Sequence, residues 1–128
     1  MATMTVVVVN EPGGLENIRI EDRDIPPPGP GQILGKVGYC GCNWADTQMR
    51  EGIYPHKTDY PLILGLEIAG EVIDVGPNVN HPKRGQRVTT LVEGGGYAQF
   101  CVADAGLATI VPEGLSLASA AAYPVQGL

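Results

Sequence analysis

The residues that could bind a metal or act as nucleophiles are few and widely spaced. The chain has three cysteines, Cys40, Cys42 and Cys101, and two histidines, His56 and His81. Thiolates and imidazoles are the usual zinc ligands, but a zinc site needs several of them within tetrahedral reach. Two thiols near the end of a strand are the simpler interpretation of Cys40 and Cys42. A thiol or metal-binding module that uses all three cysteines stays an alternative, and each histidine is expected to be solvated in a polar loop.

No local motif assigns a reaction to this chain. A nicotinamide cofactor usually binds where a strand is followed by G-x-G-x-x-G and the start of a helix. The nearest match runs from Gly29 to Gly35, but its spacing is one residue too long, and it precedes a strand. The chain also has no G-x-x-x-x-G-K-[ST] and no G-x-S-x-G. Local motifs alone therefore predict only a β-rich domain.

The elements that must position any site are predicted to be mainly strands, with two short helices. The chain has 18 glycines and 11 prolines, and turn signals recur about every ten residues, as in a barrel or sandwich. Bends are expected at Gly65 and Gly70. The predicted strands are Met4–Asn10, Ile18–Glu21, Gln32–Cys40, Leu62–Leu64, Ile68–Val75, Gln86–Val92, Tyr97–Ala103 and Thr109–Val111.

The first short helix is predicted to carry most of the polar candidates. It begins at Asn43, which can cap the free amides, and it ends at Arg50, before Gly52. Asp46 occupies the third helical position, where a negative charge is favourable. Tyr54 follows in a loop, and its hydroxyl can donate a hydrogen bond.

Composition excludes several classes of function. The formal net charge is −6, from 8 basic and 14 acidic side chains, so the chain lacks the basic surface that nucleic acid needs. No run approaches the roughly 18 apolar residues of a membrane span. We therefore expect a cytoplasmic protein with reduced thiols and no nucleic-acid or membrane partner.

Four stretches, in their order and spacing, carry a resemblance that covers nearly the whole chain. They are PGPGQ at 28–32, CNWADTQMREGIYP at 42–55, PLILGLEIAGEV at 61–72 with Val75-Gly76 behind it, and GQRV at 85–88 followed by GGYAQ at 95–99. Together they resemble the N-terminal GroES-like domain of the medium-chain dehydrogenase/reductase superfamily. The closest branch is that of the zinc-free, zeta-crystallin-like quinone oxidoreductases. The resemblance implies a partly open GroES-like β-barrel.

The resemblance also implies how the chain is divided. Residues 1–115 form the GroES-like domain, which is similar to the N-terminal domain of alcohol dehydrogenases. Residues 116–128 are the start of a linker helix that leads toward a Rossmann domain outside this chain. Ser116 caps this alanine-rich helix, Leu117–Tyr123, and Pro124 interrupts it.

The same resemblance indicates whether the protein can bind a catalytic or a structural zinc ion. In the zinc-dependent relatives a cysteine occupies the position of Asn43, and a histidine occupies the position of Leu66. The amide is a poor ligand for zinc and the isobutyl group cannot bind a metal. The structural zinc lobe has no counterpart either, because the stretch Val92–Tyr97 is too short and contains no cysteine. The resemblance therefore implies an enzyme without zinc.

The implied activity is hydride transfer from NADPH to a quinone or an activated alkene. The substrate is a small molecule and the full-length enzyme is expected to be a homodimer, whereas the 128-residue chain alone is expected to be inactive. The alternative is a GroES-like binding module without catalysis.

The resemblance implies a role for six residues. The implied catalytic residues are Asn43 and Tyr54, and the implied cofactor-binding residues are Asn43, Trp44, Asp46, Thr47 and Gln126. Structural alternatives remain for several of them: a helix cap for Asn43, helix packing for Trp44 and an exposed loop position for Tyr54. Glu67, without a histidine before it, is interpreted as structural.

Overall fold

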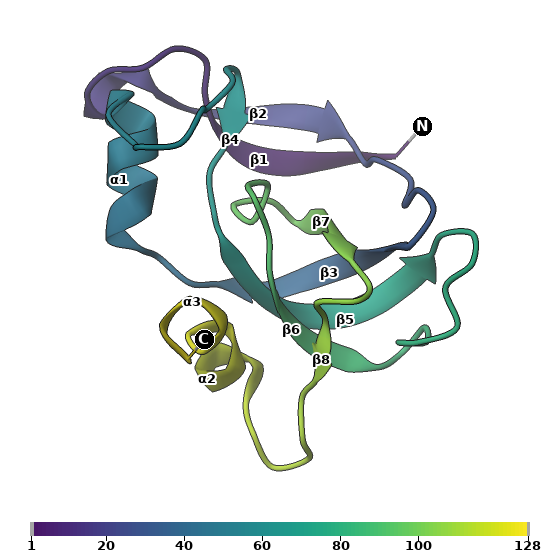
Figure 1. Cartoon of the computed structure of the whole chain (residues 1–128). Coiled ribbons are helices and arrows are strands. Elements are labelled where there is room, and N and C mark those ends of the chain that lie inside the picture. Colours follow the sequence, from purple (N-terminus) through teal and green to yellow (C-terminus); the bar gives the residue numbers. More distant parts are fainter. Residues whose placement is uncertain (1, 128) are drawn as a thin grey trace.

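A computed structural model describes residues 2–127, which fold into two antiparallel sheets (Figure 1). The smaller sheet has the order β2-β1-β4, and the larger sheet has the order β7-β3-β5-β6-β8. A bridge between Val6 and Ala98 joins them. The two sheets do not close into a full barrel, which confirms the predicted partly open GroES-like fold. The strands are β1 (Thr3–Val9), β2 (Ile18–Asp24), β3 (Gln32–Cys40), β4 (Leu62–Ile63), β5 (Glu67–Val75), β6 (Arg87–Leu91), β7 (Phe100–Asp104) and β8 (Thr109–Ile110).

Strand β1 shows how sequence alternation builds the smaller sheet. Met4, Val6 and Val8 are buried on one face, because side chains alternate between the two faces of a strand. Phe100 of β7 packs against this cluster. The apolar face of β1 is therefore buried between the two sheets.

The larger sheet has its own core and a bend in its middle. Ile33, Val72 and Val88 are buried together on one face. The register of β3 against β5 shifts between Val37 and Tyr39, opposite Gly70. A Cβ at Gly70 would lie 2.0 Å from the backbone oxygen of Lys36, so only glycine allows this approach. The extra residue of this shift is Gly38, so the irregularity lies in β3, opposite Gly70, and β5 runs through the predicted break without interruption.

Three α-helices and a short 3-10 helix make up the helical part of residues 2–127. Helix α1 (Trp44–Glu51) ends at Gly52, which has a φ of 82°. Helix α2 (Leu117–Ala121) begins where Ser116 Oγ accepts a hydrogen bond from the Ser119 nitrogen at 3.1 Å. Its C-terminal alanines pack against the larger sheet. The helix ends at Ala121, before the predicted end at Tyr123, and Pro124 starts a separate helix, α3 (Pro124–Gly127), which was not predicted. The 3-10 helix is η1 (Leu15–Asn17).

Helices α1, α2 and α3 lie on the same side of the molecule in Figure 1. This side holds the candidate site. Within residues 2–127, none of the helices combines the length and the apolar character that crossing a membrane requires.

Candidate functional site

Asn43 connects three elements through its side chain. Its Nδ2 donates a hydrogen bond to Glu67 Oε2 at 2.7 Å, and its Oδ1 accepts one from Gln126 Nε2 at 2.8 Å. Glu67 begins β5 and Gln126 belongs to α3. The Asn43 backbone starts helix α1, where its nitrogen donates a capping hydrogen bond to the Asp46 carboxylate. The two interpretations of Asn43 are therefore compatible: the backbone begins the helix while the amide joins α1, β5 and α3.

Glu67 is a buried carboxylate, with only 2% of its surface exposed. Besides the Asn43 amide, it accepts a hydrogen bond from the backbone nitrogen of Val125 at 3.1 Å. A Cβ at Gly41 would lie 2.5 Å from Glu67 Oε2, so the carboxylate fits against a glycine backbone. Hydrogen bonds of this kind are what make a buried carboxylate tolerable.

Asp46 forms a second buried polar group behind the first turn of α1. Its Oδ2 accepts hydrogen bonds from the Asn43 nitrogen at 2.9 Å and from the Tyr97 hydroxyl at 2.8 Å. Burial, together with the neighbouring side chains of Cys42 and Asp46, raises the pKa of Tyr97. The phenol therefore stays protonated and remains a donor to Asp46.

A close backbone contact brings Tyr97 and Leu66 to the site. Gly65 has a φ of 107°, and a Cβ there would lie 2.7 Å from Gly96 Cα. The Tyr97 nitrogen donates to the Leu64 oxygen at 2.8 Å, and the Val92 nitrogen donates to the Leu66 oxygen at 2.9 Å. Residues 92–97 therefore run beside the connection between β4 and β5.

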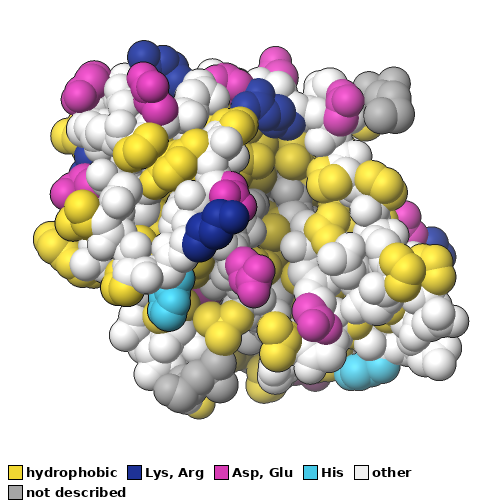
Figure 2. Space-filling model, turned by 45° about the horizontal axis from the view of Figure 1, so that its top comes forward, with side chains coloured by type: hydrophobic (Ala, Val, Ile, Leu, Met, Phe, Trp, Pro, Cys, Tyr) yellow, Lys and Arg dark blue, Asp and Glu magenta, His cyan; other side chains and the backbone are white. Residues whose placement is uncertain are grey.

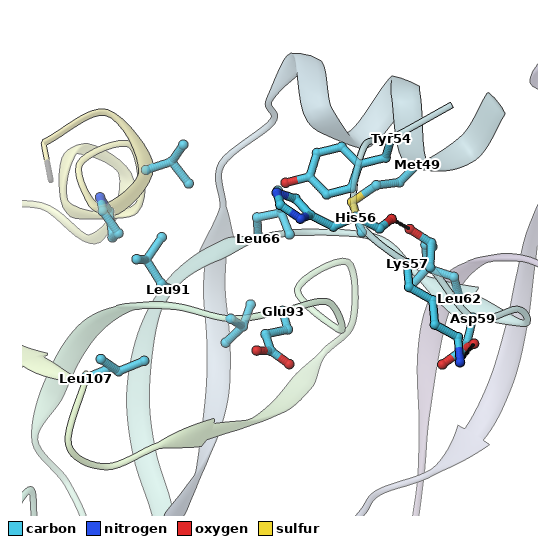
Figure 3. A pocket seen from close by; sticks show the side chains of 14 residues that line it. Met49, Tyr54, His56, Lys57, Asp59, Leu62, Leu66, Leu91, Glu93 and Leu107 are labelled. Carbon is cyan, nitrogen blue, oxygen red and sulfur yellow. Dashed lines mark hydrogen bonds and ion pairs between the residues drawn. The ribbon is translucent and has the colours of Figure 1, made fainter. Parts of the chain in front are cut away.

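A pocket of about 810 Å³ opens next to this network (Figure 3). Most of its wall is apolar, with side chains from Met49, Leu62, Leu66, Leu91, Leu107 and Val125. Charged side chains line it as well, namely Lys57, Asp59 and Glu93. Figure 2 shows a hollow with hydrophobic side chains inside it and charged side chains beside it. Leu66 faces the pocket while the next residue, Glu67, faces Asn43, which is the alternation of an extended chain.

Tyr54 and His56 contribute the aromatic part of the pocket wall. Their ring centroids are 5.4 Å apart, with an edge-to-face angle of 63°. Figure 3 shows both rings near Leu66. Tyr54 is half-buried, so the structure places it in the pocket wall rather than in an exposed loop.

The structure brings some of the predicted site residues together and leaves others apart. Asn43 and Gln126 are hydrogen bonded, Asp46 is buried behind them, and Tyr54 lines the pocket. Trp44 is 77% exposed, so it does not pack the helix. Thr47 Oγ1 donates to the Trp44 oxygen within α1 at 2.6 Å.

Sequence reasoning assigned no role to Tyr97, whose hydroxyl donates to Asp46. His56 is exposed, as expected, but it also lines the pocket, and Glu67, which was interpreted as structural, is buried and hydrogen bonded to Asn43. For Glu67 the available signal was a carboxylate within an otherwise apolar strand. His56 and Tyr97 lie on loops, and their positions depend on contacts between distant segments.

The residues at the start of α1 do not fit a catalytic zinc ion. Both polar atoms of the Asn43 amide are hydrogen bonded, and Leu66 has no ligating atom. Within the described part of the chain, no group of three or more His, Cys, Asp or Glu side chains is arranged to hold a metal ion. The ligands of a catalytic zinc are therefore not supplied by this part of the site.

The two-sheet fold, with α1 beside a pocket, defines a class of protein. Residues 29–114 match the family described as the alcohol dehydrogenase GroES-like domain. The chain belongs to this family, and the resemblance stated from its motifs is confirmed.

Individual relatives narrow this class to the quinone oxidoreductase branch. The chain is 37% identical over 124 residues to the quinone oxidoreductase of Sus scrofa, covering 95% of this chain and 38% of that protein. It is 35% identical over 116 residues to the synaptic vesicle membrane protein VAT-1 homolog of Rattus norvegicus, covering 89% of this chain and 29% of that protein. A mycobacterial protein solved in complex with NADPH matches with a TM-score of 0.86 and 37% identity, over 92% of this chain and 37% of its own. The chain thus spans about a third of the length of these relatives.

Proposed function

We propose that this chain is the substrate-side domain of a longer, NADPH-dependent oxidoreductase that reduces a quinone or an activated alkene without zinc. The largely apolar pocket with Leu66 in its wall carries this proposal. Without zinc, such a site lacks a Lewis acid to polarise a simple carbonyl, which favours acceptors that need less help. A quinone or conjugated enone spreads the incoming charge over its π-system, so hydrogen-bond donors are enough.

The cofactor side of the proposed site is the network at the start of α1. NADPH supplies the hydride when it is bound, and the protein positions the reactants. Asn43 keeps one N–H and one oxygen lone pair beyond those bonded to Glu67 and Gln126, so it fits an amide-bearing ligand. We assign the cofactor side to Asn43, Trp44, Asp46, Thr47 and Gln126.

The substrate side of the proposed site is the pocket beside this network. Tyr54 is assigned to donate a hydrogen bond to the substrate oxygen that gains charge. The apolar residues around it keep water away from the reacting atoms and strengthen that hydrogen bond. Residues 1–115 form this domain, and residues 116–128 lead toward the nucleotide-binding domain of a cytoplasmic homodimer.

The test is an assay of the full-length protein that contains this chain. We expect loss of NADPH absorbance with a quinone as acceptor, little reaction with a simple ketone, and no loss of activity after treatment with a zinc chelator. Stoichiometric zinc in the purified protein, with activity that depends on it, would overturn the proposal.

Asn43→Ala tests the assignment of the cofactor side. We expect kcat/KM to fall about tenfold or more, because one hydrogen bond is worth roughly 1–1.5 kcal/mol. Asn80→Ala is the matched control, since Asn80 is exposed in the loop between β5 and β6. Equal kinetics for the two variants would remove Asn43 from the site.

A further inference from the structure

Glu67 is an acceptor-only group at the centre of the network. Its two hydrogen-bond donors, the Asn43 amide and the Val125 nitrogen, come from segments that lie far from β5 in the sequence. None of the ion pairs among residues 2–127 includes Glu67. Its carboxylate is therefore stabilised by N–H groups and not by a cation within this part of the protein.

A carboxylate determines which way round a neighbouring amide must lie. An amide has a donor at one end and an acceptor at the other, whereas an ionised carboxylate can only accept. Asn43 must therefore turn its nitrogen toward Glu67 and its oxygen away from it. Gln126 must in turn present its nitrogen to that oxygen, as the distance of 2.8 Å between Gln126 Nε2 and Asn43 Oδ1 records.

We propose that Glu67 is a positioning residue that fixes the amide polarity of Asn43 and Gln126, so that Asn43 offers an oxygen acceptor to the nicotinamide carboxamide. This inference rests on the proposed function. It assigns the ligand group that the site selects: an N–H donor, such as the carboxamide NH2. The assignment is specific, because an inverted Asn43 amide would present a donor to the same ligand and repel it.

Glycine at position 41 offers a way to disturb Glu67 without changing a functional group. A Cβ at Gly41 would contact the end of the Glu67 side chain, with the closest atom at 2.5 Å. Gly41→Ala therefore pushes the carboxylate away while every polar group of the network is retained.

The experiment uses the full-length protein and two reduced cofactors, NADPH and its 3-acetylpyridine analogue, in which a methyl group replaces the carboxamide NH2. The unaltered protein is expected to bind NADPH about tenfold more tightly than the analogue, the value of one hydrogen bond. Nicotinamide fluorescence measures both dissociation constants. Glu67→Gln replaces the acceptor-only carboxylate with an amide that can both donate and accept. The ratio of the two dissociation constants is therefore expected to fall toward 1.

The variants separate positioning from a merely structural role. Gly41→Ala is expected to reduce the preference in the same direction, and Glu71→Gln is the control, because Glu71 is on β5 but exposed. If Glu67→Gln and Gly41→Ala keep the tenfold preference, the inference is overturned even if their melting temperatures fall. An unaltered protein without any preference would also overturn it. If the unaltered protein binds neither cofactor, the proposed function itself fails.

Discussion

The three thiols of the chain lie in different surroundings. Cys42 is exposed, whereas Cys40 is half-buried and Cys101 is buried. Burial raises the pKa of the Cys40 thiol to about 12 and that of Cys101 to about 11, from an ordinary value of 9.0. Because the thiolate is the reactive form, burial slows the reaction of these two thiols in two ways: it limits the access of a reagent, and it keeps the thiols protonated.

Thiol labelling of the 128-residue chain should therefore occur in two phases. Near pH 8, Cys42 is expected to react with an aromatic disulfide at least about a hundredfold faster than Cys40 or Cys101. Rates for Cys40 and Cys101 should rise as the pH increases toward their raised pKa values. Peptide mass spectrometry identifies the modified residue, and Cys42→Ser should remove the fast phase. A fast phase that persists in this variant would contradict the assignment.

At the residue scale, prediction succeeded where a residue's own chemistry decides its role. Asn43 was expected to start a helix, and it does, while its amide donates a hydrogen bond to Glu67. The partners of that amide were not predictable, because Glu67 and Gln126 lie 24 and 83 positions away along the chain. His56 shows the same limit, since only the folded loop brings it to Tyr54.

At the element scale, local patterns predicted the strands better than their ends. The predicted strand Tyr97–Ala103 corresponds to β7 at Phe100–Asp104. Its first residues leave the larger sheet instead: the Tyr97 oxygen accepts from the Val7 nitrogen at 2.8 Å. Strand β2 continues to Asp24, past the predicted end at Glu21, because its polar residues pair with β1 along the edge. In both cases pairing between distant segments decides the boundary.

The pairing of β3 with β5 should be disrupted by one added methyl group at Gly70. Gly70→Ala places a Cβ against the Lys36 backbone oxygen, which cannot move without breaking the sheet. We expect the free energy of unfolding to fall by about 3 kcal/mol, at the upper end of ordinary overpacking, or the chain not to fold. Urea denaturation of the 128-residue chain measures the change.

Gly35→Ala is the matched control for this substitution. Gly35 is also buried on β3, but the nearest atom to an added Cβ would be 3.8 Å away. We expect a change within about 1 kcal/mol, because the loss of unfolded-state freedom offsets small adjustments. Equal destabilisation by the two substitutions would show that the close approach at Gly70 is unimportant.

At the scale of the whole molecule, the fold class came from the order of the family motifs. Composition indicated only a barrel or sandwich, whereas the motifs predicted the partly open GroES-like arrangement. The order of strands in the two sheets was beyond local reasoning. In this order β1 pairs with β4, and Val6 pairs with Ala98. Long segments of the chain separate these partners, and the apolar cores between the sheets must offset the entropy that is lost when the segments close.

The division of the proposed site between two domains limits what the 128-residue chain can bind. Its amino-acid sequence lacks a strand, glycine-rich turn and helix start that would hold a pyrophosphate. The network at Asn43 offers hydrogen bonds to one end of a dinucleotide only. We therefore expect NADPH to bind this chain more weakly than about 1 mM, or roughly −4 kcal/mol, whereas the full-length protein binds it in the micromolar range. Calorimetry on both proteins measures the difference, and micromolar binding to the short chain would contradict the division of the site between two domains.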